Sequence, residues 1–207
     1  MNIHPYPIGE MQANCYLLEK EGQALLIDPG DSADFLLEKI ITQRFELVGI
    51  VATHGHFDHI MAIGEIQMSY PKLPLYIHEN DAFLLERVVE TARHFLGYDP
   101  VVLPIESTEN MKPGKLSLQD FDFTIIETPG HTPGSCCLYF ERENALFSGD
   151  TIFKSGMGRY DFSYSDKDEL EKSIEHILIL PEETIVYPGH GEETSIDEEK
   201  YIIQQFF

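Results

Sequence analysis

The stretch Thr53-His54-Gly55-His56-Phe57-Asp58-His59 gathers three histidines and one aspartate within six positions. The apolar run before it, Ile50-Val51-Ala52, is typical of the end of a buried strand, and in extended backbone residues two apart face the same side. His54 and His56 can therefore hold one cation, whereas Asp58 and His59 lie on the next turn of the chain. The stretch predicts two neighbouring cations rather than one, and the alternative is a solvated, histidine-rich turn.

Four further strand ends carry a residue that can bind a metal or support a ligand. In each case an apolar, β-rich run ends directly before it: these residues are Asp28, His131, Asp150 and His190. Pro-Gly pairs flank His131 on both sides and precede His190, which fixes where the imidazoles point. Because ligands collect at the carboxyl ends of strands in α/β sheets, we expect these side chains to converge with the histidine stretch on a metal site.

Length and composition restrict the class of protein. A chain of 207 residues is long enough for one α/β domain, and we expect a single domain over 1–207. The net charge of −22, with only 14 Lys and Arg, argues against nucleic acid and leaves small-molecule substrates. We find no signal peptide and no apolar run of membrane-span length, so a cytoplasmic enzyme without a membrane contact is expected. Cys15, Cys136 and Cys137 are predicted to be free thiols.

Periodicity predicts helices around the strands. One is expected from about Asp81 to Phe95, and 97–115 is expected to be irregular. A capping box of Ser165 and Asp168 is predicted to begin a later helix, which buries Leu170, Ile174 and Ile177. In the last segment, residues 202, 203 and 206 are apolar and would share one helix face; this face either docks on the core or forms a dimer contact, so monomer and homodimer both remain open.

At this point the sequence resembles the metallo-β-lactamase superfamily, and most closely its glyoxalase II (hydroxyacylglutathione hydrolase)-like branch. The resemblance covers nearly the whole chain and rests on an ordered set of motifs: Asp28-Pro29-Gly30, Thr53 to His59, Thr128 to Ser135, Ser148-Gly149-Asp150-Thr151, Gly158-Arg159-x-Asp161 and Tyr187-Pro188-Gly189-His190-Gly191. It implies an αββα sandwich of two mixed β-sheets with helices on the outer faces. Members of that branch continue beyond the position of His190 into a helical segment that helps to bind glutathione, so a chain ending at Phe207 resembles the short form.

The resemblance assigns a role to each candidate ligand. It implies that His54, His56 and His131 hold metal one, that Asp58, His59 and His190 hold metal two, and that Asp150 bridges them. Asp28 resembles an acid that orients ligands. All seven ligands offer N or O atoms, which suit Zn²⁺, Fe²⁺ and Mn²⁺ alike, and zinc is the default expectation.

These ligands imply a hydrolase. A bridging water held by two such cations would ionise near neutral pH and give a hydroxide that attacks an ester-like carbonyl. The resemblance implies that Asp58 accepts or relays the proton of this water. A thiol leaves without acid help because its pKa is about 8.5, which favours a thioester, such as a glutathione thioester, over a β-lactam. The alternatives are a mononuclear iron persulfide dioxygenase, which would share the His54, His56 and His131 constellation, and a non-catalytic metal-binding module.

Most candidate substrate contacts lie outside these motifs, and Arg159 lies within one of them. Phe95, Leu96 and Tyr98 are expected at a pocket mouth, with plain surface packing as the alternative. Three basic side chains could bind a substrate carboxylate, and the alternative for each is a surface salt bridge: these are Lys154, Arg159 and Lys200.

Overall fold

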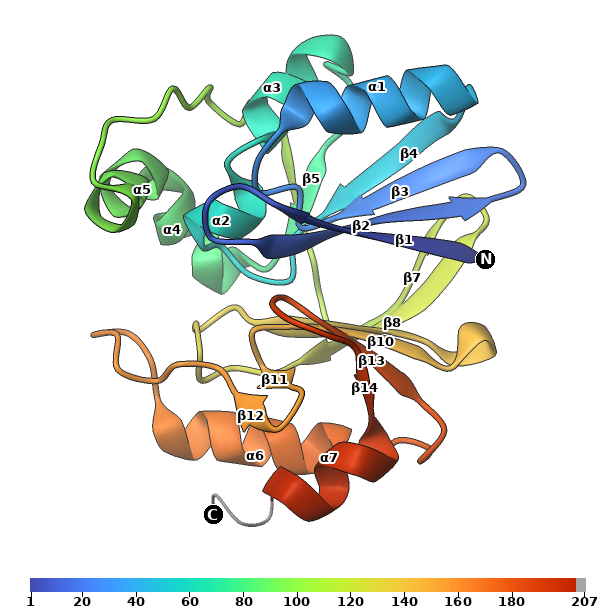
Figure 1. Cartoon of the computed structure of the whole chain (residues 1–207), viewed down its shortest axis with the longest axis vertical. Coiled ribbons are helices and arrows are strands. Elements are labelled where there is room, and N and C mark those ends of the chain that lie inside the picture. The colour runs from blue at the N-terminus through green and yellow to red at the C-terminus, as the bar shows by residue number, and fades with distance from the viewer. Residues whose placement is uncertain (204–207) are drawn as a thin grey trace.

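Two six-stranded sheets stack face to face in the computed structural model, which describes residues 1–203 (Figure 1). The first sheet has the order β1 (Asn2–Ile8), β2 (Ala13–Lys20), β3 (Gln23–Ile27), β4 (Glu46–Val51), β5 (Leu75–Ile77) and β6 (Thr108–Asn110). The second has the order β14 (Thr194–Ser195), β13 (Ile185–Pro188), β10 (Ala145–Gly149), β9 (Cys136–Phe140), β8 (Phe121–Glu127) and β7 (Gly114–Leu118). A small hairpin, β11 (Ile152–Phe153) and β12 (Gly156–Met157), lies beside them.

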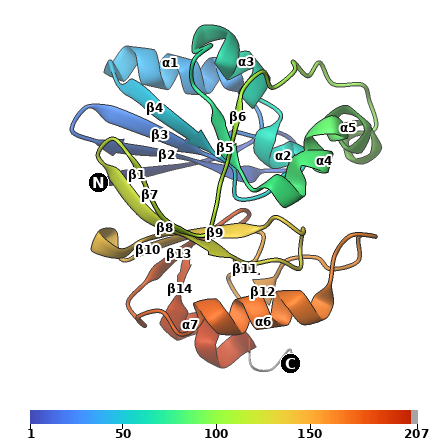
Figure 2. The same cartoon turned by 180° about the vertical axis from the view of Figure 1, so that it is seen from behind.

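Helices cover the outer face of each sheet, which confirms the predicted αββα sandwich. On the first sheet lie α1 (Ala33–Gln43) and α3 (Ile63–Ser69), with α2 (Phe57–Ile60), α4 (Ala82–Glu86) and α5 (Val88–Leu96) at its edge. On the second sheet lie α6 (Lys167–Ile177) and α7 (Ile196–Ile202), as the view from behind also shows (Figure 2). Among residues 1–203, no helix combines the length and the apolar character that crossing a membrane requires.

Each central strand is apolar on both faces because both faces are covered. In β2, Tyr16 and Leu18 pack between the sheets, while Cys15 and Leu17 pack toward the helices of the first sheet. Strand β9 alternates in the same way between the intersheet core and α6. The sandwich therefore has three buried layers, and near-continuous apolar strands are what such burial requires. All three cysteines are buried free thiols, as predicted.

The sheet topology brings the predicted strand ends to one edge. Strand β3 is parallel to β4, and β10 is parallel to β13. Strand β8 runs in the same direction as β10, because each pairs with β9 in antiparallel fashion. The carboxyl ends of β3 and β4 in one sheet, and of β8, β10 and β13 in the other, carry the candidate ligands. A single edge of the sandwich thus receives segments that are far apart in sequence.

Three local expectations differ from the structure. The helix predicted over 81–95 is two helices, because the backbone leaves helical geometry at Arg87, where φ is −105° and ψ is 3°. The stretch 97–115, expected to be irregular, contains β6 and the first residues of β7. The side chain of Asp166, not Ser165, caps α6 by accepting a hydrogen bond from the Glu169 amide at 3.0 Å.

The helix that follows this cap packs as expected. Leu170, Ile174 and Ile177 of α6 are fully buried. At the end of the described chain, Ile203 is also fully buried and joins the same cluster beneath the second sheet, so it docks on the core. Phe206 lies outside the described residues, and a dimer contact stays a prediction.

Candidate metal centre

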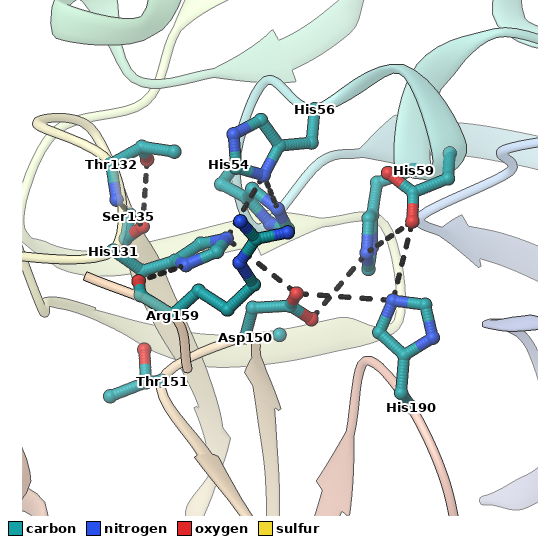
Figure 3. Close-up of polar contacts among 12 residues, drawn as sticks. His54, His56, His59, His131, Thr132, Ser135, Asp150, Thr151, Arg159 and His190 are labelled. Atoms are coloured by element: carbon teal, nitrogen blue, oxygen red, sulfur yellow. Dashed lines mark hydrogen bonds and ion pairs between the residues drawn. The ribbon is translucent and has the colours of Figure 1, made fainter. Parts of the chain in front are cut away.

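Three imidazole nitrogens converge at the junction of the two sheets. His54 and His56 follow β4, and His131 follows β8. The Nδ1 atom of His56 lies 3.0 Å from His54 Nε2 and 2.9 Å from His131 Nε2 (Figure 3). A tetrahedral ion with bonds of about 2.0–2.1 Å holds its ligand atoms about 3.3 Å apart. The spacing of this first triad therefore suits one cation.

A second triad lies next to the first. The Oδ2 atom of Asp58 is 3.3 Å from His190 Nε2 and 3.9 Å from His59 Nε2. Asp58 and His59 come from the short helix α2, and His190 follows β13. The three side chains offer ligand atoms within 4.8 Å of one another, which is close enough to bind a second ion.

Asp150, at the end of β10, reaches both triads. Its Oδ1 atom lies 3.5 Å from His59 Nε2, and its Oδ2 atom lies 3.5 Å from His131 Nε2 and 3.8 Å from His190 Nε2. Figure 3 shows this carboxylate between the histidines of the two sets. One carboxylate in this position can bridge two ions.

Two buried polar atoms support the fit of a metal. Within residues 1–203, His59 Nε2 and Asp150 Oδ1 are buried and have no hydrogen-bond partner. An unsatisfied buried polar group costs roughly 1–3 kcal/mol, so a protein rarely keeps two of them side by side without a ligand. A cation between them would satisfy both, and the residues present therefore fit a dinuclear site.

Hydrogen bonds on the far side of the rings orient the ligands. Asp28 Oδ2 lies 3.0 Å from His59 Nδ1 and accepts a hydrogen bond from Thr53 Oγ1 at 2.7 Å, while Asp28 Oδ1 accepts one from the Thr53 amide at 2.7 Å. Thr53 Oγ1 in turn lies 3.1 Å from His54 Nδ1. In these contacts the Nδ1 atoms of His54 and His59 carry the ring hydrogen and donate it to Thr53 Oγ1 and to Asp28 Oδ2. The Nε2 lone pairs of both rings therefore face the site. Asp28 thus occupies the supporting position that the sequence suggested.

The other two imidazoles of the first triad have partners that sequence reasoning missed. The carbonyl oxygen of Arg159 lies 2.8 Å from His131 Nδ1, and the Tyr164 hydroxyl lies 2.8 Å from His56 Nε2. Tyr164 is 108 positions from His56, and no motif in the sequence links the two residues. Its role depends on the loop between β12 and α6, whose path the sequence does not reveal.

Asp81 is a second residue that sequence reasoning missed. Its fully buried carboxylate accepts hydrogen bonds from the Gly55 amide at 2.8 Å, the Gly134 amide at 2.7 Å and the Thr132 hydroxyl at 2.7 Å. Gly55 separates His54 from His56, and Thr132 follows His131. Asp81 therefore ties together the two loops that carry the first triad.

Charge differs between the two triads. Burial, together with the neighbouring histidines, holds the pKa values of His54 and His56 well below the ordinary range, so both rings are neutral and offer lone pairs. Burial also opposes protonation of His59, but Asp58 and Asp150 outweigh it and raise its pKa to about 10. The surroundings of His59 thus favour a positive charge, which a bound cation would supply in place of the proton.

Glycine permits close approach at two motif positions. A Cβ atom on Gly30 would lie 1.5 Å from the Asp58 carbonyl oxygen, and one on Gly189 would lie 2.2 Å from Asp150 Oδ1. Neither separation is sterically possible, so the Asp-Pro-Gly and Pro-Gly-His turns need these glycines to pack against the ligands.

A cavity of about 240 Å³ opens over the two triads. Apolar and aromatic side chains form most of its wall: the lining residues are Met11, His56, Phe57, Asp58, Thr91, Phe95, His131, Asp150, Phe153, Met157, Arg159, Phe162, Tyr164 and His190. We call this space the metal cavity. Its size and wall suit a small organic substrate.

The predicted substrate contacts divide into two groups. Phe95 and Arg159 line the metal cavity. The Tyr98 hydroxyl instead donates to Glu10 at 3.1 Å, and Lys154 donates to Glu192 at 2.7 Å; neither residue lines this cavity. Lys200 pairs with Glu182 at 2.9 Å.

Sequence comparison finds similar proteins over almost the full length. An uncharacterized protein of Aquifex aeolicus is 37% identical over 97% of this chain and 94% of its own length. A hydroxyacylglutathione hydrolase of Haemophilus influenzae, GloC, is 35% identical over 97% of this chain and 95% of its own length.

Comparison with solved structures also finds similar proteins over almost the full length of the chain. The crystal structure of TTHA1623 in a di-iron-bound form is 34% identical, with a TM-score of 0.88, and the match covers 96% of this chain and 98% of that one. The BLEG-1 B3 metallo-beta-lactamase is 32% identical, with a TM-score of 0.89 and 97% of both chains covered.

The fold, the histidine and aspartate cluster and these likenesses agree with a family match. Residues 8–190 match the model of the metallo-beta-lactamase superfamily, and this range contains every candidate ligand from His54 to His190. The cluster lies at the edge of the sandwich and has the residue types and spacing of a metal-binding site. The chain belongs to the metallo-beta-lactamase superfamily.

Proposed function

We propose that this protein is a dinuclear metal-dependent hydrolase that cleaves small acyl thioesters, as in the glyoxalase II-like branch of the superfamily. The observation that carries the proposal is the set of seven candidate ligands, with Asp150 between two triads, five of which line the metal cavity. The likeness to a hydroxyacylglutathione hydrolase at 35% identity supports the choice of thioesters. We further propose that residues 1–207 act as one domain.

Two divalent cations, when bound, polarise a substrate carbonyl and lower the pKa of water to near neutrality. The side chains of the protein supply the group that accepts the proton. Asp58 lines the metal cavity, and although burial opposes its charge, His59 and His190 hold its pKa well below the ordinary range. Asp58 is therefore a carboxylate at neutral pH and can accept the proton of the attacking water.

The leaving group decides between substrates. A thiol has a pKa of about 8.5 and departs as thiolate without help, whereas an amide nitrogen must be protonated as it leaves. Tyr164 and Arg159 are proton carriers in the cavity wall, and burial raises the pKa of Tyr164 to about 12. So weak an acid gives an amine little assistance, and this favours the thioester.

The donor set does not select the metal. Imidazole nitrogens and carboxylate oxygens suit Zn²⁺, Fe²⁺ and Mn²⁺, and one similar structure is described in a di-iron-bound form. We propose zinc as the first metal to test and iron as the second.

β-Lactam hydrolysis is the second candidate. It is favoured by the likeness to the BLEG-1 metallo-beta-lactamase, which at 32% identity is nearly as similar as the hydrolase relative. Both reactions need the same ligands and differ in the leaving group and in what the cavity accepts.

The test compares substrates on one preparation. Protein loaded separately with zinc, iron and manganese is assayed with S-lactoylglutathione and with a chromogenic cephalosporin, and Asp150→Asn serves as the inactive control. We expect thioester cleavage at least a hundredfold faster, as kcat/KM, than β-lactam cleavage. Cephalosporin hydrolysis without thioester hydrolysis, under all three metals, would refute the proposal in favour of the second candidate.

A further inference from the structure

A second groove of about 570 Å³ adjoins the metal cavity. Five residues line both spaces and form a shared wall: Thr91, Phe95, Arg159, Phe162 and Tyr164. The far side is formed by α5 and by the residue before it: Arg87, Glu90, Arg93 and His94. We call this space the arginine groove. It is an extension of the metal cavity and lies within reach of a substrate longer than its acyl group.

The arginine groove concentrates guanidinium groups in a chain that is acidic as a whole. The protein carries 36 Asp and Glu against 14 Lys and Arg, and only five of the latter are arginines. Three of these five, Arg87, Arg93 and Arg159, line this groove, where Glu90 is the one acidic residue of the described lining. Asp99 and Asp161 pair with Arg93 and Arg159 from outside that lining. Local charge rather than net charge governs what binds at a site, so this groove favours an anion.

The three guanidinium groups remain accessible to a ligand. Their side chains are 44%, 58% and 57% exposed, and each pairs with an acid close in sequence. Arg87 donates from Nε to Glu90 at 3.3 Å, and Arg93 donates from Nε to Asp99. A guanidinium group has five donors, and exposed ion pairs of this kind are weak. Arg87 and Arg93 can therefore meet an oxyanion with donors that these two contacts do not use.

The shared wall is connected to the metal ligands. The rings of Phe162 and Tyr164 stack with centroids 5.5 Å apart, and the Arg159 guanidinium lies 4.6 Å from the Phe162 ring centre. The Tyr164 hydroxyl contacts His56 Nε2, as described above. Substrate that reaches from the metals into the arginine groove must pass this aromatic pair, which would hold its middle portion.

We propose that the arginine groove binds the anionic tail of the thiol carrier, so that substrates with terminal carboxylates or phosphates are preferred over neutral ones. The proposal rests on the thioester hydrolase function above. Guanidinium groups bind both oxyanions through paired N–H donors, and the shared chemistry is therefore an oxyanion some distance from the reacting carbonyl.

The experiment measures a preference ratio. Lactoyl thioesters of N-acetylcysteamine (neutral tail), glutathione (carboxylates) and coenzyme A (phosphates) are compared on the wild type, on Arg87→Gln, Arg93→Gln and the double variant. Arg142→Gln is the matched control, because Arg142 is an exposed arginine in a different groove, that of β7 to β9. The ratio of kcat/KM for the anionic to the neutral thioester should fall about fivefold in each single variant and about twentyfold in the double variant.

The two anionic substrates identify the source of the oxyanion. A fall confined to the glutathione thioester indicates carboxylate recognition, and a fall confined to the coenzyme A thioester indicates phosphate recognition. Ratios in the double variant that equal those of the wild type and of Arg142→Gln for both substrates would overturn the proposal.

A binding measurement separates this proposal from the proposed function. Calorimetric titration of metal-loaded protein with S-hexylglutathione, which has no scissile thioester, should show at least tenfold weaker binding in the double variant. If no thioester is hydrolysed but this loss of affinity is seen, the proposed hydrolase function is refuted and anion binding by the arginine groove is supported. The same titration is made with desulfo-coenzyme A, which lacks the thiol. If both compounds bind the double variant as tightly as they bind the wild type, the proposed anion binding by the arginine groove is refuted whatever the outcome of the assays.

Discussion

The two triads lie side by side but differ in what holds them. The first triad is made of three imidazoles, two of them with lowered pKa values, and its loops are joined by the buried carboxylate of Asp81. The second triad combines Asp58 with two histidines, and carboxylates surround His59 on several sides. Its His190 side chain is 29% exposed, whereas those of His131 and His59 are 3% and 0% exposed. The first set thus offers a preorganised nitrogen site, and the second offers charge.

This difference suggests a division of labour. Neutral imidazoles held by buried hydrogen bonds define where a cation sits, and anionic ligands nearer to solvent increase its attraction. The chemistry proposed above would need both, because the two triads would have to hold two cations that act on one water and one substrate carbonyl.

The largest effect is expected where the two triads join. Replacing Asp150 by Asn removes the anionic bridge, and kcat/KM for the thioester should fall by at least about a thousandfold because both ions lose a ligand. Metal content by elemental analysis should fall below two per chain. Asp122→Asn, a change at an exposed aspartate paired with Arg142, is the control and should retain activity. Normal metal content and activity in Asp150→Asn would refute the bridging role.

The next effect separates the triads. His59→Ala should lower the metal content from two ions to about one, with the remaining ion at the first triad, and reduce activity by roughly a hundredfold or more. His54→Ala should instead empty the first triad. Cobalt substitution followed by absorption spectroscopy distinguishes the two remaining sites by their ligands. Identical spectra for the two variants would contradict the division into two triads.

A matched pair of Asp→Asn changes tests the supporting carboxylates. Both oxygens of Asp81 and of Asp28 accept hydrogen bonds, so an amide NH₂ group must face a donor in either orientation. Asp81→Asn should weaken metal binding at the first triad by about tenfold to a hundredfold, and Asp28→Asn should do the same at the second triad. Each change should also cost roughly 1–3 kcal/mol of the free energy of unfolding. Competition with a chromophoric chelator measures the metal affinity of both triads. Equal weakening of the two triads by either variant would contradict the assignment of Asp81 to the first triad and of Asp28 to the second.

The smallest effect is expected at Tyr164. Tyr164→Phe removes the oxygen that contacts His56 Nε2 but keeps the aromatic wall, so activity should fall less than tenfold, in line with one hydrogen bond of about 1 kcal/mol. Tyr164→Ala should cost more for long substrates than for short ones, because it also removes the ring that stacks on Phe162. Equal losses for long and short thioesters would argue that the wall does not guide the substrate.

The sequence allowed the prediction of the fold and of the convergence of the ligands. His54 and His56 lie directly after one apolar strand. Their spacing of two residues turns both side chains to the same side, where they can bind one cation. Asp81, Tyr164 and the arginine groove could not be predicted, because their partners are 26 to 108 positions away in sequence and meet only through packing. The cap of α6 was misassigned by one residue for a related reason: Ser165 donates its hydroxyl to the His131 carbonyl at 2.7 Å, a tertiary contact, and Asp166 takes the local role.

In the proposed function, two metal ions serve one thioester-cleaving site. Elemental analysis of freshly purified protein, run alongside hydrolysis of S-lactoylglutathione, tests it most directly. We expect about two divalent ions per chain and thioester cleavage that is lost on chelation and restored by metal. About one iron per chain, with no cleavage and with oxygen uptake in the presence of glutathione persulfide, would contradict it and indicate a mononuclear dioxygenase.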